Sequence, residues 1–210
     1  MNTITVVDYG CGNILSVARA IEYSGNKCKV ISDPKDIEKA EKLILPGVGN
    51  FGFAISKIRK KNLEYAIKIF LEKDRPFMGI CLGMQLIYSE SDEKKGSKGL
   101  SFFDGKVEKI GKKNKDILVP HIGWNFISDD AQCKVFSKNI LKNIKPFDQF
   151  YFVHSYKVID LEKKNLKIFT DYGGEKICTS VLSDNKFLFQ FHPEKSGEKG
   201  LKIYENFCKI

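Results

Sequence analysis

Apolar residues follow two different spacings along residues 1–90 of the chain. Short apolar runs typical of buried strands alternate with segments in which apolar residues recur at helical spacing. Strands are predicted at residues 3–7, 27–32, 42–45 and 77–80, and helices at residues 51–58, 63–71 and from 82 to about 89. This alternation of strands and helices predicts a parallel sheet that is covered by helices.

Two further helices are predicted, one near each end of the chain. Asn13 is expected to cap the first of them and Gly25 to end it. Its apolar face would be made by Ile14, Val17, Ala18 and Ile21. The last helix is predicted at residues 196–208, with Leu201, Tyr204 and Cys208 on its inner side.

The pattern changes in residues 95–190, where β-branched and aromatic runs are separated by turn signals such as DYGG at 171–174. Strands are predicted at 105–110, 150–159, 166–170, 176–182 and 186–191, some of them antiparallel. No linker or internal repeat divides the chain. The sequence therefore predicts one α/β domain over residues 1–210, with a mostly parallel central sheet and an antiparallel portion in its second half.

The composition is that of a soluble globular protein. The 210 residues are 42% hydrophobic and 29% charged, which excludes intrinsic disorder and fibrous repeats. No apolar run approaches the ~18 residues of a membrane span. The first residues lack the basic start and the cleavage site of a signal peptide. A cytoplasmic protein that does not enter a membrane is therefore expected.

The net charge of +9 comes almost entirely from lysine, since the only arginines are Arg19, Arg59 and Arg75. Base and phosphate recognition favours arginine, so a solvated surface is favoured over a nucleic-acid partner. The six cysteines are irregularly spaced and form no Cys-x-x-Cys pair. This spacing favours free thiols over disulfides, and no metal site is expected.

The strongest chemical signal is the segment 77–85, FMGICLGMQ, in which Gly-x-Cys-x-Gly joins an apolar strand to a helix. A nucleophile elbow has this layout, because flanking glycines let the strand and the helix close around a strained turn. Cys81 would then lie at a helix N-terminus, where the helix dipole favours a thiolate and backbone N–H groups can hold an oxyanion. The alternative is a buried structural cysteine in a glycine-rich turn.

A nucleophilic cysteine needs a base, and the chain has three histidines. His192 follows an alternating strand, so it would lie at a strand end, where α/β sheets carry their chemistry. In extended chain Glu194 would point to the same side and orient the imidazole. His154 is predicted inside a strand and His121 in a loop, and a structural role is favoured for both.

A second oxyanion donor is suggested by residues 45–49, LPGVG, at the end of the predicted third strand. Gly47 and Gly49 allow backbone N–H groups to turn toward a ligand, although a plain turn between strand and helix explains the spacing equally well. Gly10 and Gly12 resemble the start of a dinucleotide-binding loop, but Leu15 stands where the third glycine is needed. No cofactor is therefore expected.

Taken together, these motifs resemble those of the class I glutamine amidotransferases, through residues 79–85 and through FHPE at 191–194. Within that family the resemblance is to the glutaminase subunits of imidazole glycerol phosphate synthase. It is carried by the segments 8–13 (DYGCGN), 46–49 (PGVG), 120–125 (PHIGWN), 152–156 (FVHSY) and 192–196 (HPEKS). The resemblance implies a flavodoxin-like three-layer fold and an enzyme that hydrolyses glutamine.

The resemblance also implies a role for each of these segments. Cys81 would attack the side-chain amide of glutamine, His192 would act as acid and base, and Glu194 would orient His192. The oxyanion site would comprise Gly47, Val48, Gly49 and Leu82, and glutamine would be held by Gln85, His154, Ser155 and Tyr156. Ammonia would pass to a (β/α)8-barrel cyclase subunit through an interface that contains Asn13, Trp124, Tyr151 and Lys195.

Two structural expectations follow from this resemblance. Hydrolysis without an acceptor would waste glutamine, so the oxyanion site is expected to be loose in the chain without its partner. Trp124 is expected to be an exposed anchor of the interface, with a buried core tryptophan as the alternative.

Other functions remain open on the sequence. Similar glutaminases feed ammonia to sugar amidotransferases for surface-glycan synthesis, and the same motifs fit both uses. A catalytically silent docking subunit conflicts with the intact Cys81, His192 and Glu194. A cysteine peptidase or stress protein is disfavoured by Gln85 and by the residues after His192, and a nucleic-acid binder rests on charge alone.

Overall fold

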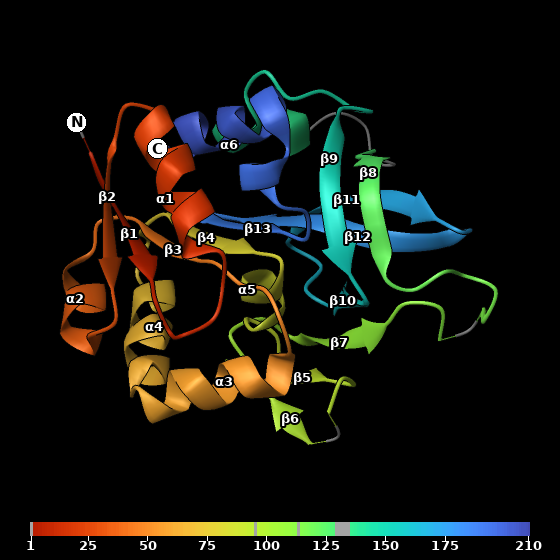
Figure 1. Cartoon of the computed structure of the whole chain (residues 1–210), viewed down its shortest axis with the longest axis horizontal. Coiled ribbons are helices and arrows are strands. Elements are labelled where there is room, and N and C mark those ends of the chain that lie inside the picture. The colour runs from red at the N-terminus through yellow and green to blue at the C-terminus, as the bar shows by residue number, and fades with distance from the viewer. Residues whose placement is uncertain (1, 95, 113, 129–134) are drawn as a thin grey trace.

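A seven-stranded sheet forms the centre of the molecule (Figure 1). The computed structural model describes residues 2–94, 96–112, 114–128 and 135–210. From one edge of the sheet to the other the strand order is β11-β12-β13-β4-β3-β1-β2. The strands are β1 (Thr3–Val7), β2 (Lys27–Ile31), β3 (Leu43–Leu45), β4 (Phe77–Ile80), β11 (Leu166–Tyr172), β12 (Glu175–Ser183) and β13 (Lys186–Phe189).

The parallel strands occupy one side of this sheet. β2, β1, β3, β4 and β13 pair in parallel, whereas β12 and β11 are antiparallel and extend the sheet beyond β13. Numbered along the chain, the parallel strands lie in the order 2-1-3-4-5, which is that of flavodoxin-like sheets. The structure thus confirms the predicted α/β class, the parallel core and the antiparallel portion from the second half.

Helices cover both faces of the sheet, which gives three layers (Figure 1). α1 (Ile14–Tyr23) and α6 (Gly197–Lys209) lie on one face, and α2 (Pro34–Lys39), α3 (Phe51–Lys60) and α4 (Leu63–Glu72) lie on the other. Short 3-10 turns occur at Val135–Ser137, Asn139–Leu141 and Pro193–Lys195. Each face buries its own apolar cluster, and this burial is the main source of stability. None of the described helices is long and apolar enough to cross a membrane.

The middle of the chain builds two smaller sheets. β8 (His121–Phe126) pairs with β9 (Gln149–His154), and a four-stranded sheet contains β5 (Glu90–Ser91), β6 (Ser97–Lys98), β7 (Gly105–Lys109) and β10 (Tyr156–Asp160). The single strand predicted at 150–159 is therefore wrong. Its two halves pair with different partners, β9 with β8 and β10 with β7, and the Ser155 carbonyl between them accepts a hydrogen bond from Ile110 N.

Three local predictions also need correction. His121 is not in a loop but begins β8, whose glycine and asparagine weaken the strand pattern in the sequence. Asn13 stands at the N-cap position of α1, but its side chain makes no capping hydrogen bond. The apolar face of α1 buries Ala20 rather than Ala18. The helix α2 is not among the predicted helices, although Asp33 caps it and a proline follows, which is a recognised start signal.

The helix after β4 is shorter than predicted. It was expected to run from Leu82 to about Ser89, but α5 (Leu82–Gln85) is a single turn. Beyond it, three backbone carbonyls accept hydrogen bonds from the N–H groups of residues 100–102 instead of from the helix; these are the carbonyls of Leu86, Ile87 and Tyr88. The local pattern of residues 82–89 cannot show that N–H groups more than ten residues further along the chain compete for these carbonyls.

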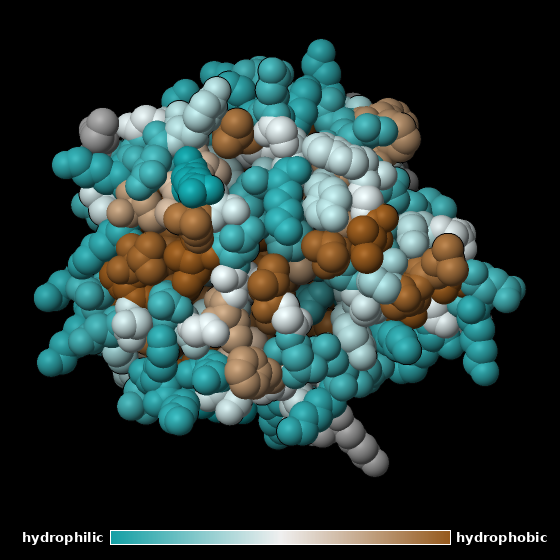
Figure 2. All heavy atoms as spheres, in the orientation of Figure 1, coloured by the Kyte–Doolittle hydropathy of each residue, from teal (hydrophilic) through white to brown (hydrophobic). Residues whose placement is uncertain are grey.

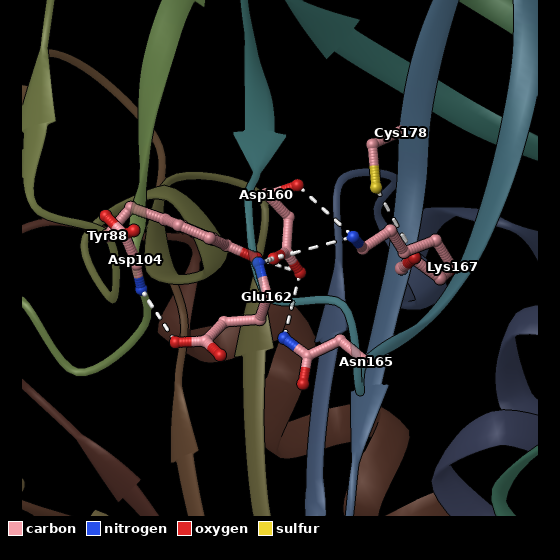
Figure 3. A network of polar contacts seen from close by, with 8 residues as sticks. Tyr88, Asp104, Asp160, Glu162, Asn165, Lys167 and Cys178 are labelled. Carbon is pink, nitrogen blue, oxygen red and sulfur yellow. Dashed lines mark hydrogen bonds and ion pairs between the residues drawn. The ribbon is translucent and has the colours of Figure 1, made fainter.

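A buried polar cluster anchors the end of β10 (Figure 3). The Asp160 carboxylate accepts hydrogen bonds from the Tyr88 hydroxyl (3.2 Å) and from Asn165 Nδ2 (2.9 Å). Lys167 Nζ lies 3.8 Å from the same carboxylate, whose side chain is 1% exposed. A carboxylate this deeply buried requires such donors. The cluster therefore fixes the end of β10, whose first residue is Tyr156.

The turn between β4 and α5 depends on a close backbone contact at Gly83. A Cβ atom at this position would lie 1.9 Å from the carbonyl oxygen of Leu45, at the end of β3. Real side chains do not tolerate such a distance, so β3 and α5 can approach each other only because residue 83 is glycine. This contact brings residues 46–49 next to the turn that carries Cys81.

We expect Gly83→Ala to lower the free energy of unfolding by about 3 kcal/mol or more, because the backbone of β3 has to move. Gly25→Ala is the matched control. Gly25 has a φ of +75°, but a methyl group added there would meet no atom within 4 Å, so a loss of only about 1 kcal/mol is expected. Urea unfolding followed by circular dichroism measures both, and equal losses would contradict the steric argument.

Candidate active site

Cys81 lies on the turn between β4 and α5. Its φ of 50° is in the left-handed region, which a non-glycine residue adopts only when its surroundings impose it. Its N–H donates to the carbonyl of Phe189, at the end of β13 (2.7 Å). The side chain is buried, and α5 provides only one helical turn, so the helix dipole acts on the sulfur less strongly than the predicted longer helix would.

His192 and Glu194 form a buried pair after β13. His192 Nδ1 lies 2.7 Å from Glu194 Oε1, and both side chains are almost completely inaccessible to solvent. The other ring nitrogen, Nε2, is buried and makes no hydrogen bond to a described residue. Burial alone would lower the pKa of His192, but its interactions with Cys81 and Glu194 outweigh burial and raise the pKa above its ordinary value. The geometry is compatible with the roles predicted from the sequence, in which Cys81 is the nucleophile, His192 its base and Glu194 the orienting acid.

A cavity of about 480 Å³ opens beside Cys81. Most of the residues singled out from the sequence line it: Asn13, Val48, Gly49, Leu82, Gln85, His154, Ser155, Tyr156 and Lys195. The cavity lining does not include Gly47, Trp124, Tyr151, His192 or Glu194. The site is therefore assembled from the ends of β3, β4 and β9, the start of β10 and the turns before α1 and α6.

One wall of the cavity is held by hydrogen bonds to the carbonyl oxygen of Tyr156. Gln85 Nε2 donates to this oxygen (3.0 Å), and His154 Nδ1 lies 2.8 Å from it. His154 Nε2 in turn lies 3.1 Å from His121 Nδ1. The residues predicted to hold glutamine are therefore brought together, and two of them share one backbone acceptor.

The backbone of residues 46–49 closes over the turn. The Leu82 N–H donates to the Gly47 carbonyl (3.3 Å), and the Tyr9 hydroxyl donates to the Pro46 carbonyl (2.8 Å). In a trans peptide the C=O and N–H point in opposite directions, so the Val48 N–H faces away from Leu82 while the Gly47 oxygen faces it. Two of the expected oxyanion donors therefore do not converge on one point in this structure.

An exposed aromatic and basic cluster lies beside the cavity. Trp124, on β8, is 54% exposed, and its ring centroid is 6.2 Å from that of Tyr151 on β9. Lys195 Nζ lies 5.8 Å from the Tyr151 ring centroid and also lines the cavity. The alternative of a core tryptophan is wrong.

The other described cysteines, apart from Cys81, have thiols whose pKa is raised. Burial raises the pKa of Cys28 and Cys208 to about 11 and that of Cys178 to about 12, so these thiols stay protonated near neutral pH. The pKa of Cys11 is also raised by burial. Within the described ranges no cysteine is in a disulfide, and no group of His, Cys, Asp and Glu could hold a metal. Cys133 lies outside the described residues.

Comparison with known proteins identifies the family. The family model described as "Glutamine amidotransferase class-I" matches residues 5–210. The imidazole glycerol phosphate synthase subunit HisH of Caldanaerobacter subterraneus subsp. tengcongensis is 47% identical over 207 residues, which are 99% of this chain and 98% of that protein. The HisH subunit of Pyrococcus furiosus is 40% identical over the full length of both chains. The chain belongs to the HisH family of class I glutamine amidotransferases.

A longer relative and a solved structure extend this comparison. The imidazole glycerol phosphate synthase hisHF of Schizosaccharomyces pombe is 39% identical over 210 residues, which are 97% of this chain but only 37% of that protein. A crystal structure of a glutamine amidotransferase matches with a TM-score of 0.73 at 14% identity, over 98% of this chain and 99% of the other. At that identity the likeness shows the fold alone, which is the amidotransferase fold implied by the sequence.

The candidate active site of this amidotransferase also contains two polar residues that belong to none of the predicted motifs. Glu93 lines the cavity, and its carboxylate accepts a hydrogen bond from the N–H of Phe51 at the start of α3. Gln190 is completely buried, and its amide contacts both Cys81 and Gln85. Glu93 lies next to a lysine-rich segment and belongs to no motif, so the sequence offers no signal for it. Gln190 directly precedes the FHPE segment, and a polar residue there in an apolar strand was the available signal.

The two other histidines of the amidotransferase are neutral. Burial lowers the pKa of His121 to about 4 and that of His154 to about 3. The ring of His121 also stacks between those of Phe152 (4.7 Å) and Tyr172 (4.0 Å). In the unfolded chain both histidines bind protons near pH 6.5. Stability is therefore complete above pH 6.5 and is lost as the pH falls toward the folded-state values.

We expect the free energy of unfolding of this amidotransferase to fall by roughly 2–3 kcal/mol between about pH 6.5 and pH 5 because of this pair. His192 does not add to this loss, because a raised pKa removes stability only as the pH rises above 6.5. Urea unfolding at several pH values measures the slope. His154→Gln cannot titrate and should reduce the slope by about half; an unchanged slope would contradict the assignment.

Proposed function

We propose that this chain is the glutaminase subunit of an imidazole glycerol phosphate synthase and serves histidine biosynthesis. It hydrolyses glutamine to glutamate and ammonia, as one domain over residues 1–210, in the cytoplasm. The observation that carries the proposal is that Cys81 lines a cavity and interacts on its inner side with the buried pair of His192 and Glu194. The full-length relatives are named as subunits of that synthase, and they favour this acceptor over sugar amidation.

These three side chains support the following chemistry. His192 Nε2 takes the Cys81 proton, and the sulfur attacks the side-chain amide carbon of glutamine. His192 returns the proton to the leaving nitrogen, which departs as ammonia and leaves a glutamyl thioester. Water, deprotonated by His192, then attacks the thioester, which releases glutamate and restores the thiol. Glu194 holds Nδ1–H, so that Nε2 is the nitrogen that exchanges the proton.

The cavity has polar groups suited to both ends of glutamine. Gln85, Ser155 and Tyr156 bind the head group, and His154 supports them by donating to the Tyr156 carbonyl. Glu93 is a carboxylate in the same lining, and it pairs with the α-amino group of glutamine. A substrate of this size fits within a cavity of about 480 Å³.

The oxyanion site is closed in the chain on its own. The Leu82 N–H is occupied by the Gly47 carbonyl, and the Val48 N–H points the other way. When the peptide between Gly47 and Val48 turns over, both N–H groups become available to one oxyanion. We infer that the partner promotes this turn, so that glutamine is hydrolysed mainly when an acceptor is ready.

The partner is a (β/α)8-barrel cyclase subunit that covers the mouth of the cavity, in contact with Asn13, Trp124, Tyr151 and Lys195. Hydrophobic side chains form a broken band across the face seen in Figure 2, and this band reaches β8 and β9. Val48 and Ile122 are among the exposed apolar residues. An exposed aromatic residue with apolar neighbours is typical of an interface. The fission yeast relative supports this proposal, because the matched region is there part of a longer synthase chain.

We expect the chain alone to be a weak glutaminase that the barrel subunit and its phosphoribulosyl nucleotide ligand strongly stimulate. Cys81→Ala should lower the stimulated rate by at least ~10³-fold, because the nucleophile is removed. Cys28→Ala, at a half-buried cysteine of β2, is the control and should leave the rate unchanged. Glutamate release is the measurement. Activity that depends on Cys81 but ignores this barrel would move the acceptor to another pathway, and no such activity would remove the enzyme proposal.

Trp124→Ala should weaken binding of the barrel subunit by about tenfold or more, as expected for an aromatic anchor. Tyr65→Ala is the matched control, because Tyr65 is 72% exposed but lies on α4, in the helical layer away from the cavity. Titration calorimetry with the barrel gives both dissociation constants. Equal affinities for the two variants would place the interface elsewhere.

A further inference from the structure

A completely buried glutamine lies beside the candidate nucleophile. Gln190 follows β13, directly before Phe191 and His192. Its backbone N–H donates to the carbonyl of Thr179 in β12 (2.8 Å), which holds the residue in the sheet. A primary amide in such a place is costly unless its donors and its acceptor find partners. The partners of this amide therefore indicate why it is there.

The side-chain amide of Gln190 joins two residues of the proposed active site. Its Nε2 lies 3.6 Å from Cys81 Sγ, within the range of a hydrogen bond to sulfur. Its Oε1 lies 3.1 Å from Gln85 Nε2. One amide thus contacts the sulfur that attacks glutamine and the side chain that is proposed to bind it.

The hydrogen bonds determine which way this amide points. Gln85 Nε2 also donates to the carbonyl oxygen of Tyr156 (3.0 Å), so Gln85 presents its NH2 group to that side. The Gln190 atom that faces this NH2 group has to accept, and is therefore Oε1. The NH2 group of Gln190 is then turned toward Cys81. The opposite assignment would set two NH2 groups against each other and leave the sulfur facing an oxygen.

We propose that Gln190 is a further catalytic residue, whose amide N–H donates to Cys81 Sγ and stabilises the thiolate. The proposal rests on the proposed function, because it assigns a role in the same thiolate chemistry. A donated hydrogen bond favours a charged acceptor over a neutral one, and such bonds are stronger than those between neutral groups. The role differs from that of His192. His192 exchanges a proton during the reaction. Gln190 keeps its protons and fixes the position of the sulfur relative to Gln85.

Gln190→Met tests this role, because it removes both hydrogen bonds while the volume of the side chain is nearly kept. Gln149→Met is the matched control, since Gln149 is exposed at the start of β9. The readout is alkylation of Cys81 in the full chain by iodoacetamide, followed by mass spectrometry from about pH 6 to pH 9, with Cys81→Ala as the blank. The high pKa of the thiols at Cys28, Cys178 and Cys208 keeps their reaction slow near neutral pH.

We expect Gln190→Met to slow the alkylation of Cys81 at neutral pH by about tenfold and to move the rise in rate to higher pH. The kcat of the barrel-stimulated glutaminase should fall by a similar factor, with a smaller change in KM. Gln149→Met should match the unchanged chain in both assays. A lower kcat with unchanged alkylation would overturn the proposal, because Gln190 would then act only through glutamine binding or packing. Unchanged values in both assays would overturn it as well.

Gln190→Glu keeps the proposal testable if the methionine variant does not fold. It retains the shape and an acceptor for Gln85, but it turns an oxygen toward the sulfur. Alkylation should be slower than in the unchanged chain, and the defect should grow as the new carboxyl group ionises. Alkylation as fast as in the unchanged chain would overturn the proposal. Iodoacetamide needs neither glutamine nor a partner, so this assay gives its answer even if no barrel elicits glutaminase activity and the proposed function fails.

Discussion

The approach of Gly83 to the carbonyl oxygen of Leu45 is the contact on which the site depends. It brings the end of β3 against the turn after β4, where a Cβ atom would lie 1.9 Å from that oxygen. The turn can then hold Cys81 at a positive φ between two strands, and β13 on the other side delivers His192. The proposed nucleophile, base and backbone donors come from separate strands, and Gly83 allows the backbone after β3 to approach the turn.

The same approach also leaves the proposed oxyanion site closed. Because residues 46–49 lie against the turn, the Gly47 carbonyl can take the Leu82 N–H for itself. The Tyr9 hydroxyl donates a hydrogen bond to the carbonyl of Pro46 and restrains the peptide between Pro46 and Gly47. The next peptide, between Gly47 and Val48, is the one that is proposed to turn over. An occupied Leu82 N–H and a Val48 N–H that faces away suit the proposed function, in which glutamine is hydrolysed mainly when a partner is bound.

Hydrogen bonds connect β8, which carries the proposed interface residue Trp124, to Cys81. The connection runs through side chains and one backbone carbonyl, in the order Asn125, His121, His154, Tyr156, Gln85, Gln190 and Cys81. The two histidines are neutral, and each offers one donor and one acceptor, so every link has a direction. In such a series of buried polar groups, each member limits the orientation of the next, and the cavity wall is kept in one arrangement.

The sequence by itself determined the parallel strands, the turn that carries Cys81 and the position of His192 at a strand end, because period, turn glycines and motif spacing are local properties. The tertiary structure alone decided the division of residues 150–159 between two sheets, the single turn of α5 and the occupied N–H of Leu82. It also decided that Gln190, which looks like an interruption of an apolar strand, faces the sulfur. Each of these features depends on a hydrogen-bonding group far away in the chain. The local spacing of residues does not show which of several distant groups will form the bond.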